Sequence, residues 1–209
     1  MVAYQGIGVR AAVVLAAFVA IVCGGLSPAQ AQKKMLFVAV GDTTRPPIGW
    51  VQFCETRPWE CNVERIEPRD VQFTAQARRE LDRINRFVNE RIKPLTDLEH
   101  YGVVEKWTYP EDGYGDCEDY VLLKRRMLMQ LGWPRSALLI TVVRDKKGEG
   151  HSVLTVRTDK GELVLDNQVE EVLPWADTGY RYIKRQAQHD PNVWVSLGDD
   201  RATPFVAAR

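Results

Sequence analysis

The sequence predicts an α+β fold, with a helical part followed by an antiparallel sheet. Residues from about 74 to 92 carry apolar side chains at every third or fourth position, which is the spacing of an amphipathic helix. A second helix is indicated from Cys117 through DYVLLKRRMLMQL, because LGWP supplies a glycine stop followed by a proline. The β-rich runs LLITVVR, HSVLTVRT and ELVLDN come next, separated by DKKGEG and DKG, and they favour an antiparallel meander.

The first 31 residues have the pattern of a secretory signal peptide. Arg10 supplies the positive charge, AAVVLAAFVAIVCGG the apolar core, and Ala29-Gln30-Ala31 a cleavage site of small residues. An uncleaved membrane anchor is the competing interpretation, but the apolar run is short for a span of about 20 residues. Cleavage would leave residues 32–209 as a single domain, periplasmic or secreted, with no further attachment to a membrane.

The remaining segments are expected to be loops and short strands. Residues 33–69 have the character of a loop, because TTRPPIGW and ETRPWEC are rich in proline and aromatic residues. Further strands are expected at YRYIKR and WVSL, and the residues from Asp200 onward are expected to be loose.

The charge balance argues against a polyanionic partner. The chain has 28 basic and 28 acidic residues, and loss of the signal peptide removes only Arg10 from this count. Such a balance gives no electrostatic basis for binding nucleic acid or an anionic membrane surface.

Three cysteines remain after export, in a compartment where disulfides persist. Cys54 and Cys61, in FCETRPWEC, can close a short loop and contribute about 2 kcal/mol by restricting the unfolded chain. Cys117 is then left unpaired. A leftover thiol in a secreted protein is either an intermolecular link or a reactive group.

A nucleophilic thiol needs a base and a group that orients the base. His151 opens one predicted strand and Asp166 closes the next. If residues 159–160 form a two-residue loop, residue 158 opposes 161, and His151 lies diagonal to Asp166 on one face of the sheet, about 7–8 Å away. If the loop takes in residue 161 as well, the register shifts by one and Asp166 turns away. The turn chemistry leaves both registers open.

The sequence GYGDCEDY surrounds Cys117 with the acidic residues Asp116, Glu118 and Asp119. The first turn of a helix stabilises a thiolate through its unpaired N–H groups and its dipole, whereas three carboxylates oppose the thiolate. A bound Ca²⁺ ion would neutralise them, because it takes oxygen ligands. Helix capping, with Asp116 as the N-cap, is the alternative and is preferred on the residues alone.

A purely structural interpretation of the same residues also exists. A lone buried cysteine is often inert packing, and a strand histidine beside an aspartate can be only a satisfied polar pair. Trp107, ten residues before Cys117, could line a cleft, but its spacing favours a place in the core.

The chain resembles the bacterial transglutaminase-like cysteine peptidases, a periplasmic family related to the papain and transglutaminase fold. The resemblance runs from about Leu81 to Trp175, and it is carried by the motifs INRFVN, EKW, GYGDCEDYVLLK, LGWP, GHSVLTV and LVLDN. It implies a papain/transglutaminase-like fold, in which the cysteine at a helix N-terminus packs on a sheet that carries the histidine and the aspartate.

For the site, the resemblance implies Cys117 as nucleophile, His151 as general base and then acid, and Asp166 as the group that orients His151. It also implies Ca²⁺ binding through Asp116, Glu118 and Asp119, which reverses the preference for capping. The backbone N–H of Cys117 is a natural oxyanion donor, and a second donor is open, with Trp107 as one candidate.

For partners, the resemblance implies a protein substrate, since some family members cut large surface adhesins and so control biofilm attachment. A regulatory membrane protein is a further partner that it allows. Two other functions stay open on the sequence: acyl transfer to an amine, which uses the same acyl-enzyme, and a non-catalytic periplasmic binding module that retains the fold.

Overall fold

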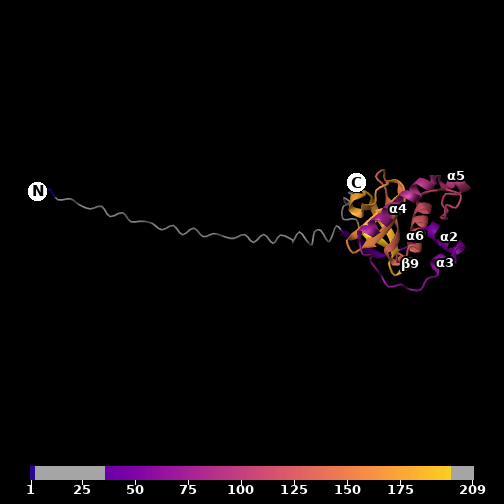
Figure 1. Cartoon of the computed structure of the whole chain (residues 1–209), viewed down its shortest axis with the longest axis horizontal. Helices are drawn as coiled ribbons and strands as arrows, with labels where there is room; N and C mark the ends of the chain where they lie inside the picture. The colour runs from indigo at the N-terminus through magenta and orange to yellow at the C-terminus, as the bar shows by residue number, and fades with distance from the viewer. Residues whose placement is uncertain (3–35, 199–209) are drawn as a thin grey trace, which may run out of the picture.

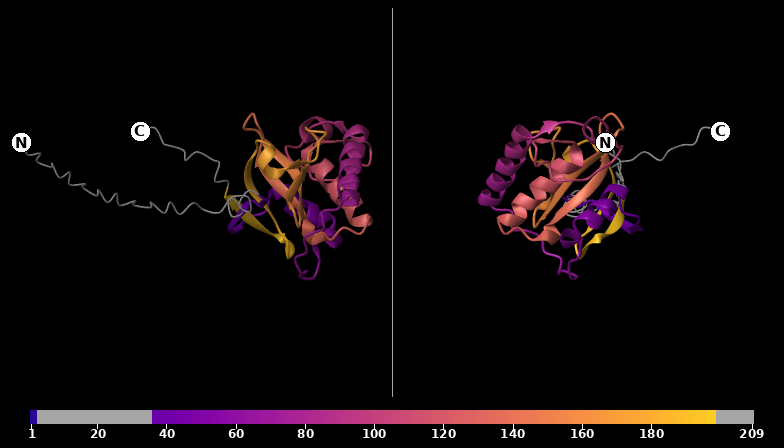
Figure 2. Two further views of the ribbon diagram at one scale, coloured as in Figure 1. Left: turned by 60° about the vertical axis from the view of Figure 1, so that its left-hand side comes forward. Right: turned by 90° about the vertical axis from the view of Figure 1, so that its right-hand side faces the viewer.

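The computed structural model describes residues 1–2 and 36–198, and it consists of a helical layer packed on a seven-stranded sheet (Figure 1). Residues 3–31 of the predicted signal peptide, and the residues from Asp200 onward that are expected to be loose, lie outside the described part of the chain. Figure 2 shows helices α4 (Ala75–Arg91) and α6 (Cys117–Gln130) side by side along the sheet, so that the sheet has a helix-covered face. The α+β class predicted from the sequence is confirmed.

The sheet has the strand order β1-β9-β8-β4-β5-β6-β7, and its neighbouring strands are antiparallel. The predicted antiparallel meander forms the centre of the sheet as strands β4, β5 and β6. The strands predicted at YRYIKR and WVSL are present as β8 and β9. The strands are β1 (Ala39–Thr44), β4 (Leu138–Arg144), β5 (Gly150–Thr158), β6 (Gly161–Leu165), β7 (Leu173–Pro174), β8 (Arg181–Ala187) and β9 (Asp190–Gly198). Two further short strands, β2 (Lys93–Pro94) and β3 (Tyr114–Gly115), form a separate parallel pair.

Two long helices form where the sequence predicts them. Helix α4 spans Ala75–Arg91, and the side chain of its N-cap, Thr74, accepts a hydrogen bond from the N–H of Ala77 at 3.1 Å. Its apolar stripe is buried, with Leu81 and Val88 fully covered. Helix α6 spans Cys117–Gln130 and packs against α4 on one side and β5 on the other.

The prediction of a loop over residues 33–69 is wrong in part. Within this stretch the chain forms β1 and two helices, α2 (Ile48–Thr56) and α3 (Pro58–Cys61). Pro47 is the N-cap of α2 and Pro58 is the first residue of α3, so both prolines start helices instead of breaking them. Strand β1 is mostly exposed at the edge of the sheet, and it therefore lacks the apolar alternation that would reveal it.

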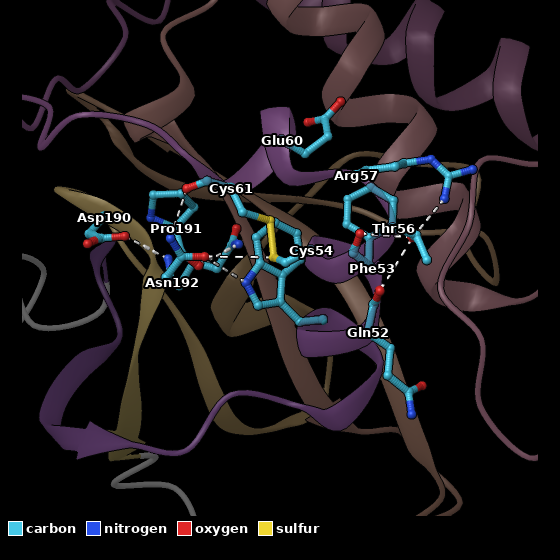
Figure 3. The surroundings of a disulfide bond; sticks show 12 residues. Gln52, Phe53, Cys54, Thr56, Arg57, Glu60, Cys61, Asp190, Pro191 and Asn192 are labelled. Carbon is cyan, nitrogen blue, oxygen red and sulfur yellow. Dashed lines mark hydrogen bonds between the residues drawn. A yellow bond between two sulfur atoms is a disulfide. The ribbon is translucent and has the colours of Figure 1, made fainter.

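The disulfide expected between Cys54 and Cys61 is present, and it joins α2 to α3 with a Cα–Cα distance of 5.6 Å (Figure 3). The side chain of Asn192, from β9, ties this loop to the sheet. Its Nδ2 donates to the carbonyl of Cys61 at 2.9 Å, and its Oδ1 accepts from the indole N–H of Trp50 at 3.4 Å. The loop is therefore fixed to the body of the protein at two points.

Trp107 lies in the core, as its spacing suggests, with 3% of its surface exposed. Its ring centroid is 6.2 Å from that of Trp50 and 6.5 Å from that of Trp194, so the three indoles form one aromatic cluster in the core. Across residues 1–2 and 36–198, the helices are all too short or too polar to cross a bilayer.

Candidate active site

Cys117 is the first residue of α6, is half-buried, and is a free thiol in the described part of the chain. Asp116 occupies the N-cap position, but its side chain makes no capping hydrogen bond. Its Oδ2 instead accepts the backbone N–H of Asp97 at 3.4 Å. Asp116 therefore occupies the expected N-cap position, but its carboxylate does not cap α6.

His151 and Asp166 meet because the hairpin of β5 and β6 has the first of the two registers considered. Thr158 pairs with Gly161 and Leu154 with Leu165, so the loop holds two residues. His151 Nε2 lies 2.9 Å from Asp166 Oδ1, and both side chains are almost fully buried. An ionised carboxylate only accepts hydrogen bonds, so Nε2 carries the proton and Nδ1 is left as the acceptor.

Cys117 lies where α6 contacts β5, beside the residue that follows His151. The backbone N–H of that residue, Ser152, lies near enough to the Cys117 sulfur to favour its thiolate. On the Nδ1 side of the imidazole, Gln168 places its amide nitrogen 3.5 Å away. The structure thus pairs His151 with Asp166 and places Cys117 against the strand that carries His151.

The surroundings of the Cys117 sulfur in this structure disfavour its thiolate form. Burial raises the pKa of Cys117 well above its ordinary value, and the charge of Glu118 raises it further. The thiol lies 3.0 Å from Glu118 Oε2 and donates to it. Any thiolate at this position therefore requires that the neighbouring carboxylate be neutralised or drawn away.

Three carboxylates gather beside the thiol: Asp97, Asp116 and Glu118 each offer an oxygen, and these atoms lie within 4.8 Å of one another. Burial, together with the mutual repulsion of the acids, raises the pKa of Asp116 and of Glu118. Asp116 Oδ1 is buried with no hydrogen-bond partner among the described residues. An all-oxygen cluster with an unpaired buried carboxylate oxygen fits a calcium ion.

Asp119 lies next to this cluster but is not one of the three residues whose oxygens lie within 4.8 Å of one another. One carboxylate oxygen accepts the backbone N–H of Thr108 at 2.8 Å, while Oδ2 is buried and lacks a partner in the described structure. Burial raises the pKa of Asp119 to about 8. Of the three predicted ligands, two therefore lie in the cluster and Asp119 lies at its edge.

Asp97 is the residue that sequence reasoning missed. It is the first residue of helix α5 (Asp97–Tyr101), which begins with a capping box formed by Thr96 and Glu99. Asp97 is 2% exposed and also accepts the backbone N–H of Lys106. A search for acids adjacent in sequence cannot find it, because it comes twenty residues before Cys117. The capping box of Thr96 and Glu99 could have located the helix, but it does not reveal that Asp97 is buried beside Cys117.

Trp107 does not supply the second oxyanion donor. Its indole N–H donates to Glu105 Oε1 at 2.6 Å, and its ring lies in the aromatic cluster of the core. The indole N–H already has an acceptor in this structure, so it is not free to act as the second oxyanion donor.

Residues 40–202 match the profile of the family described as bacterial transglutaminase-like cysteine proteinase, BTLCP. The chain belongs to this family. As a BTLCP member it is a cysteine peptidase, and its helices and antiparallel sheet form a transglutaminase-like fold. No curated protein shows a significant match to this BTLCP chain.

Solved structures similar to this BTLCP member include those of LapG from Legionella pneumophila. The calcium-bound LapG structure has 23% sequence identity and a TM-score of 0.50, with 61% of this chain and 74% of that chain covered. An EGTA-treated LapG structure has 24% identity and a TM-score of 0.48, with 61% of this chain and 70% of that chain covered. The first of these likenesses supports the fold.

Proposed function

We propose that this cysteine peptidase is a calcium-dependent endopeptidase of the periplasm, with Cys117, His151 and Asp166 as its catalytic triad. The observation that carries the proposal is the orientation of His151. Its Nε2 lies 2.9 Å from Asp166, and its Nδ1 is thereby left to accept a proton on the side of the imidazole away from the carboxylate. Cys117, at the N-terminus of α6, lies against the same strand.

In the first half of the reaction, His151 Nδ1 takes the proton of the Cys117 thiol, and the sulfur attacks the carbonyl carbon of the scissile peptide bond. The carbon–nitrogen bond then breaks, and His151 returns the proton to the leaving amine. Asp166 stabilises the imidazolium that exists between these two steps. The product is an acyl-enzyme with a thioester at Cys117.

In the second half, His151 removes a proton from water, which attacks the thioester and releases the acid with the cysteine reprotonated. The backbone N–H of Cys117 serves as an oxyanion donor in both halves, because the first amides of a helix have no partner within the helix.

A calcium ion would be held by Asp97, Asp116 and Glu118, with Asp119 at the edge of the cluster. When bound, it supplies positive charge that offsets the carboxylates around the thiol. The proposal is supported by the buried and mutually repelling acids of this chain, and by the existence of calcium-bound and EGTA-treated structures of LapG.

A protein substrate follows from membership of a protease family. We take a large surface adhesin as the proposed substrate, on the resemblance to family members that cut such proteins. The periplasmic location rests on residues 1–31, whose charge, apolar core and small-residue site have the signal-peptide pattern.

The test is comparative proteomics of cell surface and medium, with wild type against Cys117→Ala. The proposal expects at least one protein fragment that is released in the wild type and retained in the variant. A fragment pattern that does not depend on Cys117 would refute the protease assignment. Incubation with a labelled amine separates hydrolysis from acyl transfer, because hydrolysis leaves the released acid unlabelled.

A further inference from the structure

The two oxygens of the Asp166 carboxylate have different partners. Oδ1 faces His151 Nε2 and also accepts the backbone N–H of Gln168 at 2.9 Å. Oδ2 accepts a hydrogen bond from the phenol of Tyr180. Asp166, His151 and Tyr180 are each at most 4% exposed, so water does not compete freely for these bonds.

Tyr180 touches the histidine as well as the aspartate. Its ring meets the imidazole of His151 edge to face, with the centroids 5.7 Å apart and the planes at 84°. A single side chain therefore limits both the rotation of the carboxylate and the tilt of the imidazole. Neither contact was expected from the sequence.

The chain places Tyr180 here through a tight turn before β8. Gly179 has a φ of 72°, a conformation that favours glycine, and it brings the chain from the short helix of residues 175–177 back to the sheet. The backbone N–H of Tyr180 donates to the Thr178 hydroxyl at 3.3 Å, which fixes the start of β8. The phenol thus reaches Asp166 from a part of the chain separate from the β5–β6 hairpin.

We propose that Tyr180 is a positioning residue of the peptidase: its hydroxyl fixes the Asp166 carboxylate, and its ring edge holds the imidazole of His151 in line with Cys117. The proposal rests on the proposed function, in which these three residues form the triad. Tyr180 touches no reacting atom, so it acts through Asp166 and His151.

The charge on Asp166 is consistent with this assignment. Burial alone would raise the pKa of Asp166, but hydrogen bonds from His151 and Tyr180 hold it below its usual range. A phenol is suited to this place, because it adds a donor without adding a charge that would compete with the imidazolium for the carboxylate.

Tyr180→Phe tests the proposal, and Tyr182→Phe is the matched control. Tyr182 is also buried and two residues away, and its hydroxyl donates to the carbonyl of Trp175 at 3.3 Å and lies 3.2 Å from the hydroxyl of Thr178. The rate of Cys117 alkylation by iodoacetamide is measured from pH 5 to 10, with and without added calcium, together with the thermal unfolding of each variant.

For Tyr180→Phe we expect alkylation to slow about tenfold near pH 6, the size expected from losing one hydrogen bond to an ionised group. The alkylation rates of the wild type and Tyr180→Phe should converge at high pH, where the thiol ionises without help from a positively charged imidazole. Tyr182→Phe should keep the wild-type profile. A merely structural role for Tyr180 would lower the unfolding temperature without moving the profile.

A second measurement does not depend on the reactivity of the thiol. The imidazole resonances of His151 report its tautomer by NMR in the wild type and in both variants. We expect the share of the tautomer that carries the proton on Nε2 to fall in Tyr180→Phe, because a less well held carboxylate accepts the hydrogen bond of that proton less well. An unchanged tautomer and alkylation profile, or equal changes in the two variants, would overturn the proposal.

These results are distinguishable from failure of the proposed function. If the wild-type protein shows the alkylation rate of a simple thiol, the triad assignment fails while the NMR comparison still decides the role of Tyr180. If the wild-type thiol is reactive and Tyr180→Phe changes nothing, the positioning proposal alone fails.

Discussion

Thr158 pairs with Gly161 across the β5–β6 hairpin, and this pairing decides the face of the sheet on which Asp166 lies. A shift of one residue would turn the carboxylate to the opposite face and separate it from His151. The two-residue loop thus fixes the contact on which the proposed triad depends.

Asp166→Asn is expected to reduce the rate of proteolysis by about 10⁴, the size of the effect when the third member of a triad loses its charge. The amide oxygen can still accept from His151, but it cannot stabilise the imidazolium as a carboxylate does. Kinetics on the released substrate, with thermal unfolding to show that the fold persists, check the prediction. A variant that keeps more than half of the wild-type rate would contradict it.

Calcium is expected to raise the unfolding temperature of the wild type. At 100 times the dissociation constant a ligand adds about 2.7 kcal/mol, which corresponds to roughly 5–10 °C for a chain of this size. The reason is that the ion relieves the repulsion among the acids beside Cys117. Thermal scans with calcium and with a chelator measure the shift.

Asp97→Asn should lose most of this calcium shift, because Asp97 supplies one of the three clustered carboxylates. Asp112→Asn is the control, since Asp112 is nearby but exposed and pairs with His100 at 2.8 Å. Equal calcium responses in the two variants would show that the ion does not bind at the cluster.

Lys124→Met is expected to stabilise the protein by roughly 1–4 kcal/mol near pH 6. Lys124 is fully buried in α6, its ammonium has no hydrogen-bond partner among the described residues, and burial lowers its pKa to about 7. In the folded state the charged form is therefore disfavoured. Chemical denaturation of both proteins gives the free energy difference.

The pH dependence of that difference follows from the same shift. A lysine whose pKa is lowered on folding destabilises the protein fully at pH values below about 7, and the effect fades as pH rises toward the ordinary lysine pKa. The gain in Lys124→Met should thus be smaller at pH 9 than at pH 6. Lys160→Met, at a side chain that is 69% exposed, should change stability by less than about 0.5 kcal/mol at either pH.

Replacing both Cys54 and Cys61 by serine is expected to lower stability by about 2 kcal/mol, because the disulfide closes a loop with a sequence separation of only seven residues. The unfolding temperature should fall by roughly 4–8 °C. Alkylation of Cys117 should keep its rate, since Asn192 still ties the loop to β9. A large loss of Cys117 reactivity would mean that the disulfide loop also shapes the site.

The central elements of the fold could be predicted because each has a local signal. Helix α4 carries its apolar stripe, and β4, β5 and β6 are β-rich runs separated by turn residues. The segment of β1, α2 and α3 could not be predicted in the same way. Its prolines start helices, its edge strand is exposed, and its stability comes from tertiary contacts such as the one between Trp50 and Asn192.

The residues of the candidate site also differ in whether the sequence contains a local signal for them. Cys117, His151 and Asp166 could be proposed from the sequence because an odd cysteine at a helix start and two strand ends can be recognised there, and the structure shows the contact of His151 with Asp166. Asp97 and Tyr180 were not, because each reaches the site through the tertiary fold. The register of the β5–β6 hairpin could be predicted only in part. The sequence reduced it to two alternatives, and the structure shows the one with a two-residue loop.

The two outer strands of the sheet bear on aggregation. At one end, Pro174 in the two-residue strand β7 has no N–H to offer to an incoming strand. At the other end, the pairing of β1 with β9 is interrupted by a bulge between Val40 and Thr43. Both irregularities discourage edge-to-edge pairing of the sheet with that of another copy.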